Sequence, residues 1–234
     1  VNRPDLPVGV TGTGAMGRGI AQVAAAGGIR VMMADSRPGA AQEARDFIEK
    51  MLVRAAEKGS MTKDEAVGAV NRLQIVGGPS DMKPCHAVIE VIVENLEAKQ
   101  KLFAELEAVV APDCILATNT SSLSVTTIAS RMKTPQRFAG FHFFNPVPLM
   151  RLVEVIDGLQ TELEHGIHQA LIDEIDALGV ILRHAGVGRG ETKGAFEVVQ
   201  RGEDGANRLH RRKVEYIGPL AFGAAAEIVV VGAK

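Results

Sequence analysis

Short apolar runs alternate with longer amphipathic stretches over most of the chain. The apolar runs are typical of buried strands, and the stretches between them have the spacing of helices. The expected strands are 7–11, 29–34, 73–76, 87–93, 114–118, 137–143 and 152–157. The expected helices are 15–26, 38–58, 63–72, 96–110 and 162–178. This order predicts an α/β fold, in which helices cover both faces of a mainly parallel sheet. The consecutive helices at 38–58 and 63–72 predict a helical hairpin that stands off the sheet.

A glycine-rich loop follows the first expected strand. The run Gly12-Thr13-Gly14-Ala15-Met16-Gly17 lies between a strand and a helix, which is the context that a dinucleotide loop requires. Gly12 permits a tight turn, Gly14 lets the backbone approach a pyrophosphate, and Gly17 allows the helix to pack closely on the strand. The helix N-terminus then faces the anion. The loop predicts a Rossmann-type, dinucleotide-binding sheet.

The second expected strand leads into Asp35, in the region where a ribose-binding acid is expected, roughly 20 residues beyond the loop. A carboxylate here accepts hydrogen bonds from a ribose diol and repels a 2′-phosphate, which favours NAD. Arg37 favours NADP instead, because an arginine at this place can accommodate the 2′-phosphate of NADP. The prediction is NAD.

Candidate chemistry lies on the last two expected strands before residue 160. Alternation along 152–157 places Glu154 on the face opposite its valine neighbours. A carboxylate within a strand usually faces solvent, whereas a buried one needs a partner, for which His142 is the candidate. An imidazole held by a carboxylate can take a hydroxyl proton near neutral pH, as hydride transfer from an alcohol requires. Together with the glycine loop, this pair indicates an alcohol dehydrogenase. The alternative for His142 is a satisfied core histidine.

Ser121 follows the strand at 114–118, at the edge where open parallel sheets bind ligands. The alternative is that Ser121 or Ser122 only caps the helix that starts near Val125. Both functions are compatible if Ser122 caps and Ser121 binds. Glu90 also lies in an apolar strand, and the sequence assigns it no role.

Composition narrows the class of protein. The 234 residues, 46% of them hydrophobic, suffice for one large domain or for one domain and part of another. A net charge of -2 gives no general attraction to nucleic acid, and no apolar run has the roughly 18 residues of a membrane span. Cys85 and Cys114 are expected to be buried thiols in a reducing, cytoplasmic setting. No signal peptide is expected. The histidines lack metal-site spacing, so no metal is expected.

Several motifs together resemble the L-3-hydroxyacyl-CoA dehydrogenases of fatty-acid and butanoate metabolism. They are the glycine loop, VIVEN at 91–95 with Lys99, NTSSL at 119–123, and HFFNPVP at 142–148 with LVEV at 152–155. The resemblance covers about residues 6–178. HFFNPVP after NTSSL is highly specific to that family, whereas the glycine loop alone is shared by many unrelated enzymes.

The resemblance implies a role for each matched residue. His142 would be the catalytic base and Glu154 its carboxylate partner, while Ser121 would bind the 3-hydroxyl of the substrate and Asn145 would lie beside the nicotinamide. The implied cofactor contacts are Gly12, Gly14, Ala15, Met16, Gly17, Asp35, Glu94, Lys99, Ser121 and Asn145. The implied reaction is the reversible, NAD-dependent oxidation of an L-3-hydroxyacyl-CoA thioester to the 3-ketoacyl-CoA.

Residues after about 178 depart from the family pattern. Family members continue into a helical domain that closes over the substrate and forms a homodimer, but here Arg183 occupies the position of an active-site asparagine. We expect an NAD-binding domain at 1–183 and a truncated or divergent, partly helical remnant at 184–234, whose glycines weaken any helix. From this tail we expect cofactor binding with weak thioester turnover, and no family-type homodimer.

Two other classes of protein remain open. A non-catalytic NAD-binding relative of the crystallin type is favoured by the divergent tail and disfavoured by the retained His142, Glu154 and Ser121. A Rossmann-type dehydrogenase of free hydroxy acids is disfavoured by the HFFNPVP run. Cofactor titration, together with assays on acetoacetyl-CoA and on a free 3-hydroxy acid, separates the three classes.

Overall fold

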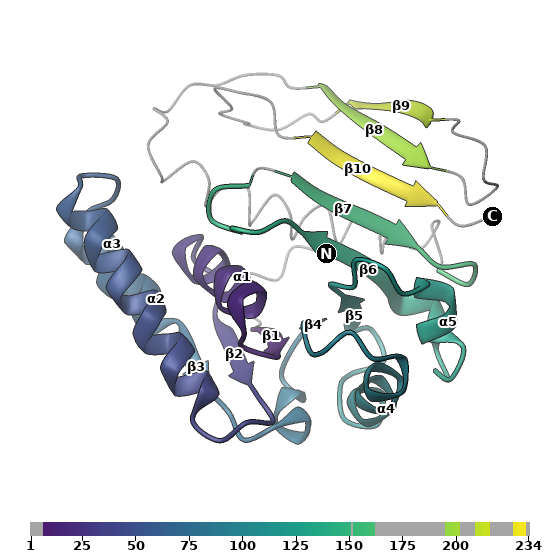
Figure 1. Ribbon diagram of the computed structural model, residues 1–234, viewed down its shortest axis with the longest axis horizontal. Helices are drawn as coiled ribbons and strands as arrows, with labels where there is room; N and C mark the ends of the chain where they lie inside the picture. Colours follow the sequence, from purple (N-terminus) through teal and green to yellow (C-terminus); the bar gives the residue numbers. More distant parts are fainter. Residues whose placement is uncertain (1–6, 151, 162–194, 202–208, 216–226, 233–234) are drawn as a thin grey trace.

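The described residues form one large sheet with helices on both faces (Figure 1). The computed structural model describes residues 7–150, 152–161, 195–201, 209–215 and 227–232. The strands of the 8-stranded sheet lie in the order β10-β7-β6-β5-β4-β1-β2-β3. Their bounds are β1 Val8–Thr11, β2 Val31–Ala34, β3 Leu73–Ile75, β4 Ala87–Glu90, β5 Ile115–Thr118, β6 Phe138–Phe143, β7 Leu152–Asp157 and β10 Glu227–Gly232. Within the described residues, β6 and β7 pair antiparallel and the other neighbours in this sheet pair parallel.

Strand side chains alternate between two hydrophobic cores, one on each face of the sheet. In β2, Val31 and Met33 join the core under one set of helices, and Met32 and Ala34 join the core on the opposite face. The first core includes residues of α1 (Ala15–Ala26), α2 (Ala40–Glu57) and α3 (Lys63–Asn71). The second includes residues of α4 (Leu96–Glu107), α5 (Val125–Ala129) and the short 3₁₀ helix η1 (Pro79–Met82). A second 3₁₀ helix, η2 (Pro135–Arg137), precedes β6. The predicted two-faced α/β architecture is confirmed.

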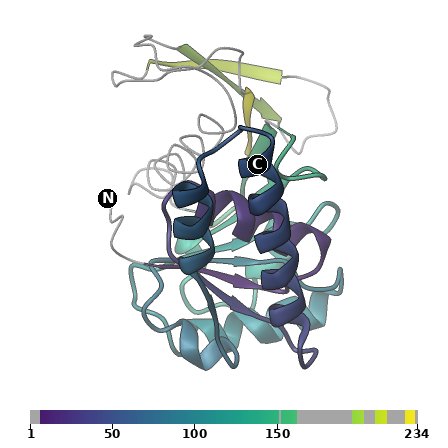
Figure 2. The same cartoon turned by 90° about the vertical axis from the view of Figure 1, so that its left-hand side faces the viewer.

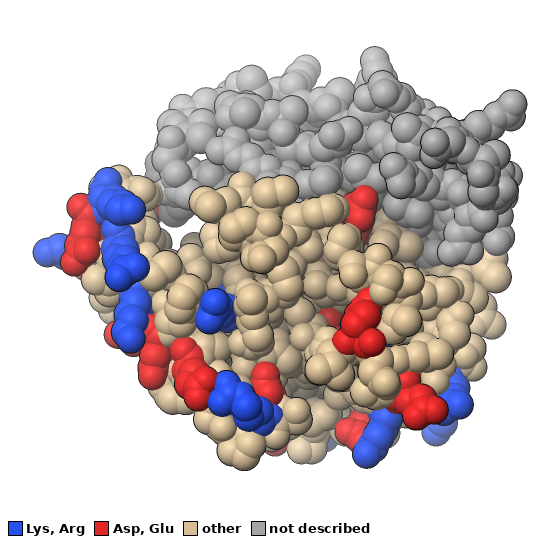
Figure 3. Space-filling view, viewed as in Figure 1, with Lys and Arg blue, Asp and Glu red and all other residues tan. Residues whose placement is uncertain are grey.

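The predicted helical hairpin is formed by α2 and α3, which lie side by side beyond one edge of the sheet (Figure 2). Ala44, Ile48 and Leu52 recur every fourth residue on the buried side of α2. Thr62 and Glu65 form a capping box that starts α3. In Figure 3 basic and acidic side chains alternate along this edge of the molecule. A surface of mixed charge gives the hairpin no general attraction for polyanions.

Two local predictions are wrong around the ends of strands. The strand predicted at 87–93 ends at Glu90, because the Glu90 carboxylate accepts the amide of Ile92 at 2.7 Å and turns the chain out of the sheet. The helix near Val125 is present, but its N-cap is Ser124, whose hydroxyl accepts the Thr127 amide at 3.2 Å. Ser122 therefore does not cap this helix.

The described parts of the chain after residue 184 are strands, so the expectation of a partly helical remnant is wrong there. β8 (Ala195–Arg201) and β9 (Leu209–Glu215) form an antiparallel pair, and β10 extends the large sheet beside β7. Residues 228–231 are four consecutive β-branched residues, which favour a strand. The helix predicted at 162–178, Arg183 and the boundary between 183 and 184 lie outside the described residues.

The two cysteines are free and buried, as predicted. Burial raises the pKa of the Cys85 thiol to about 12, and burial likewise raises the pKa of Cys114 to about 12. Both side chains act as small core residues of the α4 and α5 face. Among the helices of the described residues, none is both long and apolar enough to cross a membrane.

Candidate active site

The glycine loop at the carboxyl end of β1 is shaped to receive an anion. Gly12 has φ +93°, and a Cβ there would lie 2.5 Å from the Val91 carbonyl oxygen. A Cβ at Gly17 would overlap the Gly12 carbonyl oxygen, so α1 packs directly on the turn. Gly14 is exposed, and nothing lies within 4 Å of the Cβ that it lacks. It is also the N-cap of α1 and offers no side chain to accept the first helix amides. The loop therefore leaves both space and amide donors for a pyrophosphate.

Asp35 is held against this loop. Its Oδ2 accepts the Thr13 amide at 2.7 Å and the Thr13 hydroxyl at 2.9 Å, and its Oδ1 accepts the Arg37 amide at 2.9 Å. Burial opposes ionisation, but the bonds from the Thr13 and Arg37 amides outweigh it and hold the pKa of Asp35 below its ordinary value. The Arg37 guanidinium is paired with Glu43 at 3.0 and 2.5 Å. An ionised carboxylate, with its neighbouring arginine engaged elsewhere, fits a ribose diol.

His142 and Glu154 are brought together by the antiparallel pairing of β6 and β7. They are directly opposite in register, and Nδ1 of His142 lies 2.9 Å from Oε2 of Glu154. Their side chains are 17% and 27% exposed, so the pair is reachable from solvent without being fully hydrated. An ionised carboxylate only accepts hydrogen bonds, so Nδ1 carries the proton in this contact and Nε2 of the neutral ring is an acceptor. This arrangement is suited to taking a proton.

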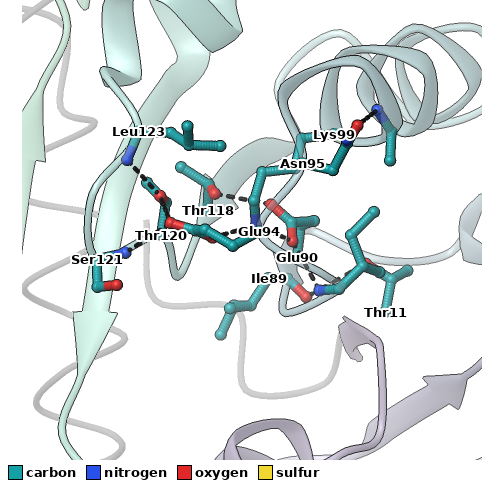
Figure 4. A network of polar contacts seen from close by, with 12 residues as sticks. Thr11, Ile89, Glu90, Glu94, Asn95, Lys99, Thr118, Thr120, Ser121 and Leu123 are labelled. Carbon is teal, nitrogen blue, oxygen red and sulfur yellow. Dashed lines mark hydrogen bonds and ion pairs between the residues drawn. The ribbon is translucent and has the colours of Figure 1, made fainter.

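Glu94 organises the loop that carries Ser121. Its Oε1 accepts the Thr120 hydroxyl, the Ser121 amide at 3.2 Å, and the Ser122 amide and hydroxyl at 3.3 and 3.1 Å (Figure 4). Its Oε2 lies 3.3 Å from the Lys99 ammonium. Burial opposes ionisation, but the Thr120 hydroxyl, Lys99 and Ser122 outweigh it and lower the pKa of Glu94 to about 2. The carboxylate is therefore charged at neutral pH and fixes the serine loop.

The segment after β6 runs from the end of the strand that carries His142 to residues that pack on helix α1. Asn119, after β5, accepts the Phe143 amide on its Oδ1 at 2.7 Å. Asn145 is exposed and is joined to Pro146 by a cis peptide bond. The position of a Cβ at Gly19 of α1 is 2.9 Å from the Val147 Cβ, so this segment packs directly on the helix of the glycine loop. Helix α1, which begins in the glycine loop, and the segment that follows His142 are thereby packed together.

Residues 7–173 match the family described as "3-hydroxyacyl-CoA dehydrogenase, NAD binding domain". The chain belongs to this family. It is 46% identical over 155 residues to a protein of Bacillus subtilis named "Probable 3-hydroxybutyryl-CoA dehydrogenase", a match that covers 66% of this chain and 54% of the relative. It is 42% identical over 155 residues to the 3-hydroxybutyryl-CoA dehydrogenase of Bradyrhizobium diazoefficiens, covering 66% of this chain and 53% of that one.

Solved structures give the same assignment. The 3-hydroxybutyryl-CoA dehydrogenase of Escherichia coli K12 superposes with a TM-score of 0.71 at 40% identity, over 74% of this chain and 36% of that one. The (S)-3-hydroxybutyryl-CoA dehydrogenase of Ralstonia eutropha gives a TM-score of 0.70 at 37% identity, over 74% of this chain and 60% of that one. The chain spans about half the length of the curated relatives it matches.

Three polar residues that the sequence did not assign to the candidate site take part in it. They are Thr13, which holds Asp35, Asn119, which holds the end of β6, and Glu90, which pairs with Lys99 at 2.6 Å. The signal for Glu90 is an acid at the end of an apolar strand with a lysine nine residues later. Within the described residues, no group of three or more His, Cys, Asp or Glu side chains could hold a metal ion.

The charge of Glu94 predicts a loss of stability in acid. Its pKa is about 2 in the folded chain against an ordinary 4.5, so its contribution is complete above pH 4.5 and disappears as the pH falls toward 2. Glu94→Gln is therefore expected to flatten the fall of melting temperature with pH in this window. Thermal unfolding across that range is the measurement, with the exposed Glu105→Gln as the control. Parallel curves for wild type and Glu94→Gln would contradict the prediction.

Proposed function

We propose that this chain catalyses the reversible, NAD-dependent oxidation of an L-3-hydroxyacyl-CoA thioester to a 3-ketoacyl-CoA. The observation that carries the proposal is the 2.9 Å contact between His142 Nδ1 and Glu154 Oε2, in a sheet that also carries a glycine loop with open space at Gly14. Membership of the dehydrogenase family supports the same substrate class.

The residues around the glycine loop fit the dinucleotide. Gly14, Ala15, Met16 and Gly17 would offer their amides and the end of α1 to the pyrophosphate. Gly12, whose own amide donates to the Ala34 carbonyl, would shape the turn. The ionised Asp35 would accept the ribose hydroxyls, and the remaining contacts toward the nicotinamide end would come from Glu94, Ser121 and Asn145. Lys99, which the family resemblance implies as a further contact, is 1% exposed and would act through Glu94. When bound, NAD supplies the acceptor for the hydride that leaves the 3-carbon of the substrate.

The protein residues handle the proton. Ser121 would hydrogen-bond the 3-hydroxyl of the substrate and hold it toward Nε2 of His142, which takes the hydroxyl proton as the carbonyl forms. Glu154 keeps the ring in the tautomer with Nε2 free and stabilises the imidazolium that results. In the reverse direction the protonated His142 returns the proton to the forming hydroxyl. Removing such a base typically costs about 10² to 10⁴ in rate.

The proposal is tested by mixing the purified chain with acetoacetyl-CoA and NADH and following the loss of NADH absorbance. A parallel reaction with free acetoacetate, and a direct NADH titration, complete the set. We expect NADH binding and weak, thioester-dependent oxidation of NADH, with the free acid slower still. NADH binding without thioester turnover would favour a non-catalytic relative, and faster turnover of the free acid would favour a hydroxy-acid dehydrogenase.

The proposal also covers the substrate molecule that the chain binds and the cell compartment in which it works. The substrate carries its acyl group as a thioester of coenzyme A. The two free, buried thiols fit a reducing compartment such as the cytoplasm. We propose that residues 1–183 are the NAD-binding domain and that 184–234 do not build the homodimer of the family. Sedimentation of the chain with and without NADH tests this last point.

Asp35 predicts cofactor choice. NADH is expected to bind more tightly than NADPH by about ten- to hundredfold, because a carboxylate that faces a 2′-phosphate costs on the order of 1 to 3 kcal/mol. Asp35→Ala is expected to narrow this gap. Parallel fluorescence titrations measure both constants, and Asp46→Ala is the control, since Asp46 is exposed and bonds Gln42 instead. Tighter NADPH binding by the wild type would show that Arg37 overrides the acid.

A further inference from the structure

Glu90 is a fully buried acid at the carboxyl end of β4, beside the candidate site. It is 0% exposed, and both carboxylate oxygens are engaged. Oε1 accepts the Lys99 ammonium at 2.6 Å and the Ile92 amide at 2.7 Å, and Oε2 accepts the Thr118 hydroxyl at 2.7 Å. Thr118 is opposite Glu90 in the parallel register of β4 and β5. Glu90 therefore joins the ends of two central strands to helix α4.

Lys99 extends this contact to the surface of the site. Its side chain is 1% exposed and lies between two carboxylates, Glu90 at 2.6 Å and Glu94 at 3.3 Å. The Glu94 side chain, unlike that of Glu90, is 38% exposed. It also holds the loop from Thr120 to Ser122 by hydrogen bonds. Figure 4 shows the two acids lying between the β5 segment on one side and the helix with Lys99 on the other.

The energetics of burial suggest that this pair has a use beyond stability. Removing two charges from water costs several kcal/mol each, and an apolar pair of similar volume is often as stable or more so. Stability alone would therefore be served by hydrophobic residues at Glu90 and Lys99. The arrangement instead delivers one ammonium to Glu94, whose other oxygen fixes the backbone of Ser121.

We propose that Glu90 is a positioning residue, which acts through Lys99 to hold Glu94 and thereby sets the place of the Ser121 loop against the bound dinucleotide. The inference rests on the proposed function in taking Glu94 as a cofactor contact and Ser121 as a substrate contact. Glu90 itself touches neither ligand, since its carboxylate is enclosed by Lys99, Thr118 and the Ile92 amide. Its effect is transmitted by two ion pairs that share one ammonium.

Glu90→Gln tests the proposal, because it removes the charge of the side chain and leaves its shape almost unchanged. The amide cannot accept and hold the ammonium as a charged carboxylate does, so Lys99 shifts its pairing toward Glu94 and the serine loop loses its fixed anchor. We expect NADH affinity to fall about tenfold, within the range that changes along such connected networks produce. We also expect amide hydrogen exchange of the peptide around 119–124 to become faster, while that of the β1 peptide is unchanged.

Glu107→Gln is the matched control. Glu107 is also on α4 and also accepts several bonds, from the amides of Lys133 and Thr134 and from the Thr134 hydroxyl. Its contacts lie at the opposite end of the helix from Lys99, so the variant is expected to keep wild-type NADH affinity and exchange around 119–124. A general effect of removing a carboxylate from α4 would appear in both variants.

The double variant Glu90→Gln, Lys99→Met separates positioning from folding. Neutralising both partners removes the buried ammonium that Glu90→Gln leaves without its buried carboxylate partner, so thermal stability is expected to recover toward wild type. NADH affinity and slow exchange of the serine loop are not expected to recover, because in the double variant Glu94 has no ammonium to hold it. A pair whose role is only structural would recover all three quantities in the double variant.

NADH affinity and loop exchange are both independent of turnover, so they test the role of Glu90 separately from the proposed dehydrogenase activity. Wild-type NADH affinity and loop exchange in Glu90→Gln would overturn the inference while leaving the thioester assay intact. Recovery of affinity in the double variant would overturn it equally, by assigning the pair to folding. Weaker NADH binding with faster loop exchange in both variants, at near wild-type stability in the double, supports the inference.

Discussion

His142→Ala is expected to lower the turnover of acetoacetyl-CoA with NADH by about 10² to 10⁴, the usual contribution of a positioned acid or base. The ring lies 2.9 Å from Glu154 on the neighbouring strand, and its loss leaves no group in the same place to exchange a proton with the substrate. NADH affinity is expected to remain near wild type, because the glycine loop and Asp35 follow β1 and β2, away from His142 on β6. Steady-state rates and an NADH titration on the same preparation measure both quantities.

Glu154→Ala is expected to reduce turnover as well, and the double variant should lose much less than the product of the two single losses. Groups that act as one proton-transfer unit are non-additive, since the carboxylate contributes only while the imidazole is present. The exposed Glu105→Ala serves as the control. Losses that multiply cleanly, or a His142→Ala variant with unchanged turnover, would show that the pair does not act as a unit.

The features that sequence could predict depend on local periodicity and on backbone requirements. The apolar runs gave the strand positions, and alternation along 152–157 placed Glu154 on the face where it meets His142. The glycine loop could also be predicted from the sequence, because the backbone at Gly12 and the packing of α1 at Gly17 tolerate no side chain. These constraints act within a few residues of the motif, so the motif itself reveals them.

The features that sequence could not predict depend on contacts between distant segments. Glu90 and Lys99 meet only because α4 folds back over the end of β4, and their 2.6 Å contact leaves no periodic signal. Ser124 caps α5 because it directly precedes Val125, the first residue of the helix, whereas Ser122 bonds Glu94 at 3.1 Å. After residue 184 the family pattern gave no guide to the described strands. Of these, only β10 has a run of four β-branched residues, at 228–231, that favours a strand.

Gly14→Ala is expected to weaken NADH binding by about ten- to hundredfold, since a methyl group forced into a close contact costs roughly 1 to 3 kcal/mol. Within the protein the added Cβ meets nothing within 4 Å, so thermal stability is expected to remain near wild type. The cost appears only when the pyrophosphate approaches the backbone at this point. Equal NADH affinity in wild type and Gly14→Ala would show that the dinucleotide does not approach the chain here.

Two further glycines make the test specific. Gly78→Ala is the matched control, because its Cβ also meets nothing within 4 Å and its φ of 167° is extended backbone that any residue adopts. It lies before η1, outside the glycine loop, and is expected to change neither stability nor NADH affinity. Gly17→Ala is expected to lower both, since its Cβ would overlap the Gly12 carbonyl oxygen and push α1 away from the turn. Loss of affinity at unchanged melting temperature is therefore expected of Gly14 alone among the three variants, and it is the result that assigns the open space above this glycine to the cofactor.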